Sequence, residues 1–248
     1  LIIADTGSEL SYLEGCSAPR RPNHQLHSGV VEVVALDNAA VKYATVQNWA
    51  DSVYNFVSKR ARAGRDAKVF WTQVEIGSAK TWKYPSTVLA GDNAQSDFYS
   101  LTITRGTQQA DTGTKMLHIG NNTKSNIVSY GVALEESIQT FRSLVSFSET
   151  TIGAKNACKC DSRIIGENAA ANTRPTVIHN NGENEQSHEA ATGAIPADAL
   201  FYLETAGIAE DEATALIVGG LAAPIISRLP MEFLVESKQL IQMALAKA

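Results

Sequence analysis

Short β-branched runs, separated by turn residues, recur through residues 1–192. Val30–Leu36 and Val41–Trp49 are two examples, and Gly, Asn and Asp stand between such runs. Within Val41–Trp49, Gln47 and Trp49 lie two residues apart and therefore share one face of a strand. No helix-length pattern of comparable strength interrupts these runs. The pattern therefore predicts an all-β solenoid, sandwich or barrel.

The apolar character of the runs bears on the choice among these architectures. Val30–Leu36 is apolar at nearly every position, which is typical of strands buried on more than one side. No strict sequence repeat marks successive turns of a solenoid. We favour a right-handed parallel β-helix, a mainly β fold, over residues 1–194.

The pattern becomes helical from Pro196. Pro196 suits a first helical position and Gly207 suits a helix end. A second helix is expected from Glu210, with Gly219–Gly220 and Pro224 breaking it into two short helices or kinking it. A third helix is expected after Pro230, with Leu234, Ile241, Ala244 and Leu245 on its apolar stripe. Residues 195–248 are thus predicted to form a small α-helical domain.

Three helices after a solenoid allow two interpretations. They can cap an end of the solenoid, where strand edges and core are otherwise exposed, or they can form a docking surface for another protein.

Composition and charge exclude several classes of protein. The 248 residues include 21 Lys and Arg against 26 Asp and Glu, a net charge of −5, and 44% of them are hydrophobic. The chain is too apolar for a disordered protein and too weakly charged for a histone-like one, and its acidity gives no reason to expect nucleic acid as a partner. No apolar run is long enough to span a membrane. The segment Leu1–Asp5 lacks the features of a signal peptide and reads like the middle of a strand, so we expect further residues upstream.

Several catalytic motifs are absent from the sequence. There is no P-loop, no Gly-rich dinucleotide fingerprint, no His-Glu-x-x-His and no Cys-x-x-Cys. Asn121–Thr123 matches a glycosylation acceptor, but we interpret it as a turn. Three cysteines are an odd and sparse set, which suits a reducing compartment better than a disulfide framework.

Two of these cysteines form the first candidate site. On a strand, Cys158, Cys160 and Ser162 project from one face. A pair of thiolates can bind iron, zinc or copper, or carry a persulfide sulfur. The alternative is that both cysteines are small buried hydrophobic residues.

Adjacent His188 and Glu189 form the second candidate site. They could be metal ligands or a proton relay, although neighbours on a regular strand point to opposite faces. The alternative is a solvated polar strand. His118 is interpreted as a strand histidine with satisfied ring nitrogens, and we place His24 and His27 in a loop without chemistry.

Tryptophans 49, 71 and 82, together with Gln47 and Gln73, form a third pattern. Mixed aromatic and polar side chains could line a channel or a sugar site, whereas such aromatics more often belong to a core. This pattern motivates an alternative function as a β-helix carbohydrate-active enzyme of the polysaccharide lyase type.

Motifs along the whole chain resemble the SufB/SufD family of the SUF iron–sulfur cluster assembly machinery. The matching segments are Tyr12–Pro19, Tyr43–Trp49, Trp71–Glu75, Thr81–Ser86, Gln109–Met116, Cys160–Ser162, His188–Ala190 and Leu229–Glu232. The retained cysteine positions favour the SufB type, and a SufD-like structural subunit is the second alternative.

The resemblance implies an architecture and a set of partners. The family has a right-handed parallel β-helix followed by a helical domain that docks SufC, a separate ABC-type ATPase. A SufD paralogue or a second SufB pairs with the β-helix, and a sulfur-donor protein supplies sulfur. Family members also have an N-terminal helical region that this sequence lacks, so we expect the chain to be a fragment. A flavin is associated with complexes of the family, but no motif here indicates a flavin site.

The resemblance also assigns roles to individual residues. Cys160 falls on the cysteine that receives sulfur and ligates the nascent cluster, with Glu189 and neighbouring His188 as metal-site residues. Cys16 falls on a second sulfur acceptor. Gln47, Trp49 and Lys59 match residues that line a sulfur path between the two cysteines. Cys158 matches no family role.

Together these implications define a functional hypothesis. The chain is expected to be a scaffold, not an enzyme, that assembles an iron–sulfur cluster, expected to be [4Fe–4S], and transfers it. ATP hydrolysis is expected only in the partner. The expected compartment is the cytoplasm, or a plastid in a eukaryote.

Overall fold

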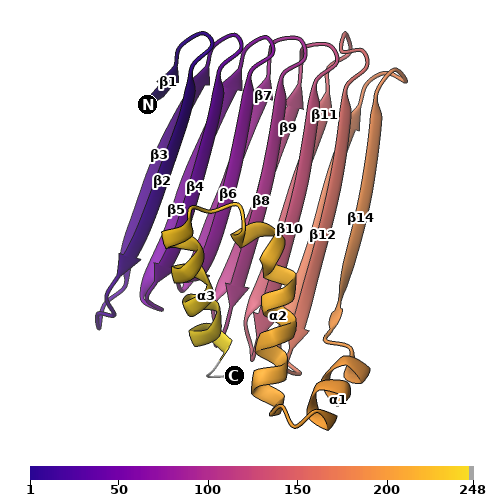
Figure 1. Ribbon diagram of the computed structural model, residues 1–248. Coiled ribbons are helices and arrows are strands. Elements are labelled where there is room, and N and C mark those ends of the chain that lie inside the picture. Colours follow the sequence, from indigo (N-terminus) through magenta and orange to yellow (C-terminus); the bar gives the residue numbers. More distant parts are fainter. Residues whose placement is uncertain (246–248) are drawn as a thin grey trace.

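The computed structural model describes residues 1–245, which form two parallel β-sheets and three helices (Figure 1). The first sheet, called sheet A, contains in spatial order β1 (Ile2–Ala4), β3 (Gln25–Ala35), β5 (Val53–Ala63), β7 (Lys80–Leu89), β9 (Gln109–His118), β11 (Ile138–Phe147) and β13 (Ala170–His179). The second sheet, called sheet B, contains β2 (Glu9–Ala18), β4 (Ala40–Trp49), β6 (Lys68–Gly77), β8 (Gln95–Thr104), β10 (Lys124–Leu134), β12 (Lys155–Ile165) and β14 (Glu185–Ala194).

The chain alternates between the two sheets, so each turn adds one strand to each of them. Successive strands of a sheet pair in parallel and in register, as with Glu9 and Ala40 or Ala40 and Lys68. The predicted parallel β-solenoid is therefore confirmed. The separation along the chain varies between turns, since Ile2 pairs with Val33 but Tyr54 pairs with Lys80. This variation explains why no strict repeat is visible in the sequence.

A column of left-handed residues marks the same corner in the first six turns. Its members all have positive φ angles: Gly7, Asn38, Asp66, Asn93, Asn122 and Gly153. The backbone N–H of Asn38 donates to Arg65 O at 2.8 Å, and that of Asn93 donates to Asn121 O at 2.8 Å. Asn, Asp and Gly tolerate this conformation better than other residues. The column includes Asn122, so the interpretation of Asn121–Thr123 as a turn agrees with the structure.

The interior between the sheets is apolar near this corner and polar farther along the strands. The apolar part is a cluster that includes Val41, Val69, Phe98 and Phe141. Beyond it lie fully buried polar side chains, among them Gln47, Lys59, Gln73 and Lys83. Buried polar groups are costly unless they are hydrogen-bonded, so this polar part requires a structural or functional reason.

Helices α1 (Ala197–Thr205), α2 (Glu210–Ile226) and α3 (Met231–Leu245) follow the solenoid. Helices α2 and α3 lie across the outer face of sheet B, as Figure 1 shows. Val218, Ile225 and Ile241 share a hydrophobic core there with Val74 and Leu101 of the sheet. Helices α2 and α3 therefore do not have the position that the first of the two interpretations, a cap over a solenoid end, requires, because the outward apolar residues of sheet B offer them a face to bury.

The expected break in the second helix is also wrong. Helix α2 continues from Glu210 to Ile226 with Pro224 inside it. Pro224 lies in the last turn, and buried Val218, Ala222 and Ile225 hold the helix on both sides of the proline. Packing thus outweighs the low helix propensity of glycine and proline. The helix end before Gly207 and the third helix after Pro230 agree with the structure, while residues 246–248 of the predicted helical domain lie outside the described residues.

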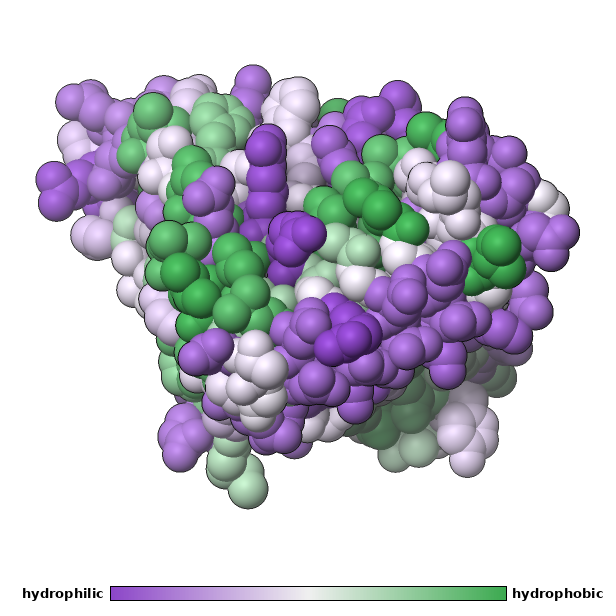
Figure 2. Space-filling view, turned by 90° about the horizontal axis from the view of Figure 1, so that it is seen from above, coloured by the Kyte–Doolittle hydropathy of each residue, from purple (hydrophilic) through white to green (hydrophobic). Residues whose placement is uncertain are grey.

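The surface of the molecule is mixed in character. Viewed from above, it is mostly hydrophilic, with separate hydrophobic patches between the polar residues (Figure 2). Among the described residues, none of the helices has the length and apolar character that crossing a membrane requires.

Candidate functional site

Two rows of inward-facing side chains cross the polar part of sheet B. The first row contains the paired residues Glu14, Thr45, Gln73, Ser100, Ser129 and Cys160. The second, two residues farther along each strand, contains Cys16, Gln47, Glu75, Thr102, Gly131 and Ser162. Cys16 therefore stands at the start of one row, and Cys160 is next to last in the adjacent row, before Ala190 of β14. At roughly 4.8 Å per strand, the five steps between β2 and β12 separate the two cysteines by about 24 Å.

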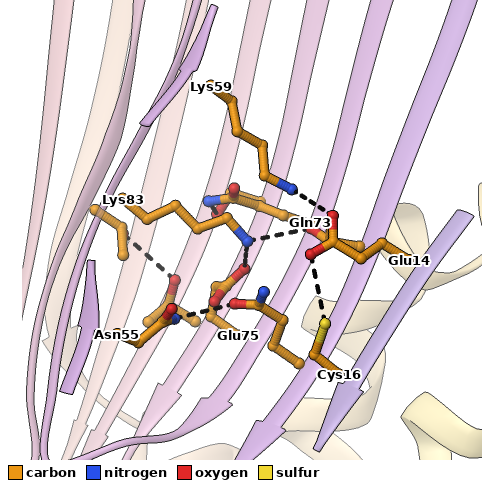
Figure 3. Close-up of polar contacts among 12 residues, drawn as sticks. Glu14, Cys16, Asn55, Lys59, Gln73, Glu75 and Lys83 are labelled. Atoms are coloured by element: carbon orange, nitrogen blue, oxygen red, sulfur yellow. Dashed lines mark hydrogen bonds and ion pairs between the residues drawn. The ribbon is translucent and has the colours of Figure 1, made fainter. Parts of the chain in front are cut away.

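Glu14 connects Cys16 to the interior (Figure 3). Both side chains come from β2, two residues apart, and the Cys16 thiol donates to Glu14 Oε1 at 3.4 Å. Lys59 Nζ, from β5 on the opposite sheet, donates to Glu14 Oε2 at 3.0 Å, and the Tyr43 hydroxyl donates to the same oxygen. One carboxylate thus binds a thiol, an ammonium and a phenol.

These contacts shift the pKa values of the groups involved. Burial would raise the pKa of Glu14, but the charge of Lys59 and the hydrogen bonds from Tyr43 and Lys59 outweigh it and lower the pKa to about 2. Burial, together with the charge of Lys83, lowers the pKa of Lys59 to about 8. Burial and the neighbouring Glu14 carboxylate raise the pKa of the Cys16 thiol. Cys16 is therefore held as a thiol at neutral pH.

A second ion pair lies beside the first. Lys83 of β7 is completely buried and pairs with Glu75 of β6. Its Nζ also donates to Thr45 Oγ1 at 3.3 Å. The interior near Cys16 thus contains two ammonium groups from sheet A and two carboxylates from sheet B.

Gln47 and Trp49 lie next to this charged group. Asn55 Nδ2 donates to Gln47 Oε1 at 3.0 Å, and Asn55 Oδ1 lies 2.8 Å from His27 Nδ1. The rings of His27 and Trp49 are 4.6 Å apart between centroids. The expectation that His27 lies in a loop is wrong, because its strand pairs with β5 and turns the imidazole toward Asn55. Gln47 Nε2 and Trp49 Nε1 are buried, and neither has a hydrogen-bond partner within residues 1–245.

Cys158, Cys160 and His188 meet at the opposite end of sheet B. The two Sγ atoms are 3.6 Å apart, and one ligand atom from each of the three residues lies within 4.8 Å of the others. His188 Nε2 is buried and has no hydrogen-bond partner in the part of the chain that the structure describes. A hydrogen bond from Cys160 lowers the pKa of the Cys158 thiol, and the same contact, together with burial, raises the pKa of Cys160. Two sulfurs and an imidazole form a donor set suited to iron or zinc.

Glu189 lies on the other face of β14 from His188. Its carboxylate is exposed and accepts from Lys159 Nζ at 3.1 Å. Of the residues expected at the metal site, His188 therefore lies beside Cys160, whereas Glu189 lies on the opposite face of the sheet. His118 is buried, and its ring nitrogens lie 2.8 Å from Thr123 Oγ1 and from Ser125 Oγ, as expected for a satisfied strand histidine.

Comparisons with known proteins identify the family of this chain. Residues 1–221 match the family described as "SUF system FeS cluster assembly, SufBD core domain". The chain belongs to the SufBD family. An iron–sulfur cluster assembly SufBD family protein of Synechocystis sp. is 49% identical over 253 residues, which cover 99% of this chain and 53% of that protein. A chloroplastic SufBD family protein of Arabidopsis thaliana is 46% identical over 99% of this chain and 45% of its own length.

The matches cover nearly all of this chain but only part of each relative. The chain spans about half the length of these curated SufBD relatives. The family is described by its part in iron–sulfur cluster assembly by the SUF system. The three tryptophans do not form a shared sugar platform, since Trp71 is buried in the core and Trp82 is exposed on the outer face of sheet A.

Sequence reasoning missed several members of this SufBD site. The sequence pattern does not single out Glu14, Glu75 or Lys83, and it offers Cys158 only as one of a candidate thiolate pair, without a role from the family. A buried lysine in a strand cannot be told from a surface lysine without knowledge of the opposite sheet. The sequence does contain a signal for the register between turns, namely the corner residues Asn38, Asp66, Asn93 and Asn122. Aligning the turns on these residues brings Glu14 and Cys160 into one row.

Proposed function

We propose that this chain is a SufB-type scaffold that accepts sulfur at Cys16 and assembles a nascent iron–sulfur cluster at Cys160. The observation that carries the proposal is the pair of buried polar rows that run across sheet B from the strand of Cys16 to the strand of Cys160. A structural solenoid would favour an apolar interior at these positions, because unpaired buried polar groups destabilise the fold. Retention of both cysteines favours a SufB-type role over a SufD-like one.

The first step of the proposed function is sulfur transfer to Cys16. The Cys16 sulfur attacks the outer sulfur of a donor persulfide and the sulfur–sulfur bond of the donor breaks. The proton of the Cys16 thiol passes to the leaving donor sulfur, so the products are a Cys16 persulfide and a donor thiol. A persulfide anion at this position carries negative charge beside the ammonium groups of Lys59 and Lys83. Lys59 therefore orients the sulfur inward, and Gln47 and Trp49 offer unpaired N–H groups beside the same path.

The second step is cluster assembly at the far end of the rows. Cys160 and His188 supply the ligands expected for iron, and the geometry adds Cys158 to them. The exposed Glu189 is a further candidate ligand toward a partner chain. Three donors do not close a [4Fe–4S] site, so we infer that a SufD paralogue or a second copy completes it at the open edge formed by β13 and β14. An incomplete ligand set suits a scaffold that must release its product.

The helices are the proposed docking surface for a SufC-type ATPase, and ATP hydrolysis is assigned to that subunit alone. The exposed aromatic side chains of α1 support this assignment, since Phe201 is 67% and Tyr202 is 73% exposed. The Arabidopsis relative is named as chloroplastic. A plastid, or the cytoplasm of a bacterium, is the compartment that we propose.

Anaerobic reconstitution tests the proposed cluster site. The purified protein is incubated with ferrous iron and sulfide, and the sulfur-to-iron charge-transfer absorbance and the bound iron are measured. We expect wild type and Cys16→Ala to show the same absorbance, because free sulfide bypasses the sulfur acceptor, whereas Cys160→Ala loses it. Full iron and sulfide content in Cys160→Ala would overturn the site assignment.

A further inference from the structure

Cys158 and Cys160 form a pair of thiols that the proposed function uses only as ligands. Both point into the interior from β12, and they are 4% and 2% exposed. Their Sγ atoms are in contact at 3.6 Å. The chain has only three cysteines, and the remaining one, Cys16, stands five strand spacings away. Cys158 is therefore the one thiol of this chain that can react with sulfur bound to Cys160.

Sulfur that arrives as a persulfide is at the wrong oxidation level for a cluster. The outer sulfur of a persulfide is sulfane sulfur, whereas an iron–sulfur cluster contains sulfide. Each sulfur atom must therefore gain two electrons before or during assembly. A neighbouring thiol is a two-electron reductant of this kind, because a thiolate attacks a sulfur–sulfur bond and forms a disulfide.

We propose that Cys158 is a resolving cysteine that releases sulfide from a persulfide on Cys160. The Cys158 sulfur attacks Sγ of Cys160, the bond between Sγ and the outer sulfur breaks, and a Cys158–Cys160 disulfide forms. The outer sulfur leaves with the electron pair of the broken bond and takes up the proton of the Cys158 thiol, so that the products are one disulfide and one hydrogen sulfide. The two thiol sulfurs are oxidised by two electrons in total, and the sulfane sulfur is reduced by two.

The position of the pair suits this reaction. A disulfide requires the sulfur atoms to be about 2.05 Å apart, so the two Sγ atoms must approach each other by about 1.5 Å. A disulfide between residues two apart on one strand departs from ideal geometry, which makes it easier to reduce. An external dithiol then restores both thiols, which are again available as iron ligands. Cys158 lies in the register row of Phe98 and Ile127, next to the polar row that contains Cys160, so the polar path across sheet B leads to Cys160 and not to Cys158.

The inference rests on the proposed function, and a sulfide-release experiment separates the two. The reduced full chain is loaded anaerobically with inorganic polysulfide, desalted, and followed without added thiol. Released sulfide is quantified over time, and peptide mass spectrometry locates persulfide and disulfide. We expect wild type to release about one sulfide per loaded Cys160 and to gain the Cys158–Cys160 disulfide. Cys158→Ser should keep the extra sulfur on Cys160 and release sulfide at least about tenfold more slowly.

Matched variants make the outcome decisive. Glu9→Gln, on the outer face of β2, keeps the thiol pair and should release sulfide as wild type does. If the buried hydroxyl of Cys158→Ser impairs folding, Cys158→Ala removes the same thiol without introducing a hydroxyl. Equal release from the Cys158 variants, or a stable persulfide on Cys160 in wild type, would overturn the inference while leaving sulfur acceptance intact. Absence of persulfide on Cys160 in every variant would instead overturn the proposed function and this inference with it.

Discussion

Three different side chains meet at the carboxylate of Glu14. Tyr43, Lys59 and Cys16 all bond to it, so the carboxylate links the sulfur acceptor to the charged interior. Lys59 is 1% exposed, and a buried ammonium without a partner would be strongly unfavourable. At the scale of the residue, Glu14 is what allows a cation to stand next to a thiol inside the solenoid.

Acid should weaken the fold through Glu14. Its pKa is lowered from 4.5 to about 2, so its stabilisation is present above pH 4.5 and is lost as the pH falls from 4.5 toward 2. The shift corresponds to at most about 3 kcal/mol. We expect Glu14→Gln to be less stable than wild type at pH 6, and the difference to shrink at pH 2.5, when both are measured by urea unfolding. Glu9→Gln, on the outer face of the same strand, is the control, and an unchanged difference at the two pH values would contradict the assignment.

The residues that sequence reasoning could find are those whose role depends on local pattern or on a motif. Gln47 and Trp49 share a face because strands alternate, and Cys160 stands in a recognisable motif. Glu14 and Lys83 depend instead on contacts across sheets, and Glu14 and Lys59 are 45 positions apart. Such pairs require the register between turns, which a variable turn length hides.

Among the elements, the corners of the solenoid determine that register. Each left-handed corner residue donates its backbone N–H to the next turn, which aligns successive strands. The same alignment places one inward residue of each strand of sheet B in a row. The corners are therefore the elements on which the geometry of the interior depends.

Substitution at a corner should test this dependence. Asn93 has a φ of 61°, and a β-branched residue there is strained, whereas glycine is not. We expect Asn93→Val to lower the free energy of unfolding by about 2 kcal/mol relative to Asn93→Gly. Both variants lose the exposed bond to Asp66, so that the comparison isolates the backbone. Equal denaturant midpoints for the two variants would contradict this interpretation.

The bounds of the helices depend partly on local sequence and partly on packing against sheet B. The start of α3 after Pro230 follows from the restrictions on proline, and it is found where expected. The continuity of α2 through Gly219 and Pro224 follows from the sheet beneath it, which the sequence of the helix does not contain.

On the scale of the whole molecule, the helices cover one face and leave the others free. Helices α2 and α3 pack on sheet B, while the outer face of sheet A and the edge at β14 carry no described element (Figure 1). Helix α1 has no buried residue, so packing against the described residues does not explain its aromatic side chains. This arrangement supports the assignment of separate surfaces to an ATPase and to a second scaffold chain.

The proposed ATPase surface can be tested without removing the helices, which would uncover the core on sheet B. We expect Phe201→Ser combined with Tyr202→Ser to weaken binding of a SufC-type ATPase by about tenfold or more, because exposed aromatics often anchor interfaces. The Tm should stay unchanged. Ile119→Ser combined with Ile152→Ser removes exposed apolar area from the solenoid and should leave binding intact. Wild-type affinity in the α1 variant, measured by titration calorimetry, would contradict the docking assignment.

The register rows relate the distance between Cys16 and Cys160 to the number of turns between them. Each turn adds one step of about 4.8 Å to the distance between Cys16 and Cys160. Inserting or deleting a whole turn would change that distance by one step and leave the rows continuous. A single inserted residue within β12 would instead turn Cys160 to the outer face. Lineages can therefore vary the spacing between the two cysteines only in units of complete turns.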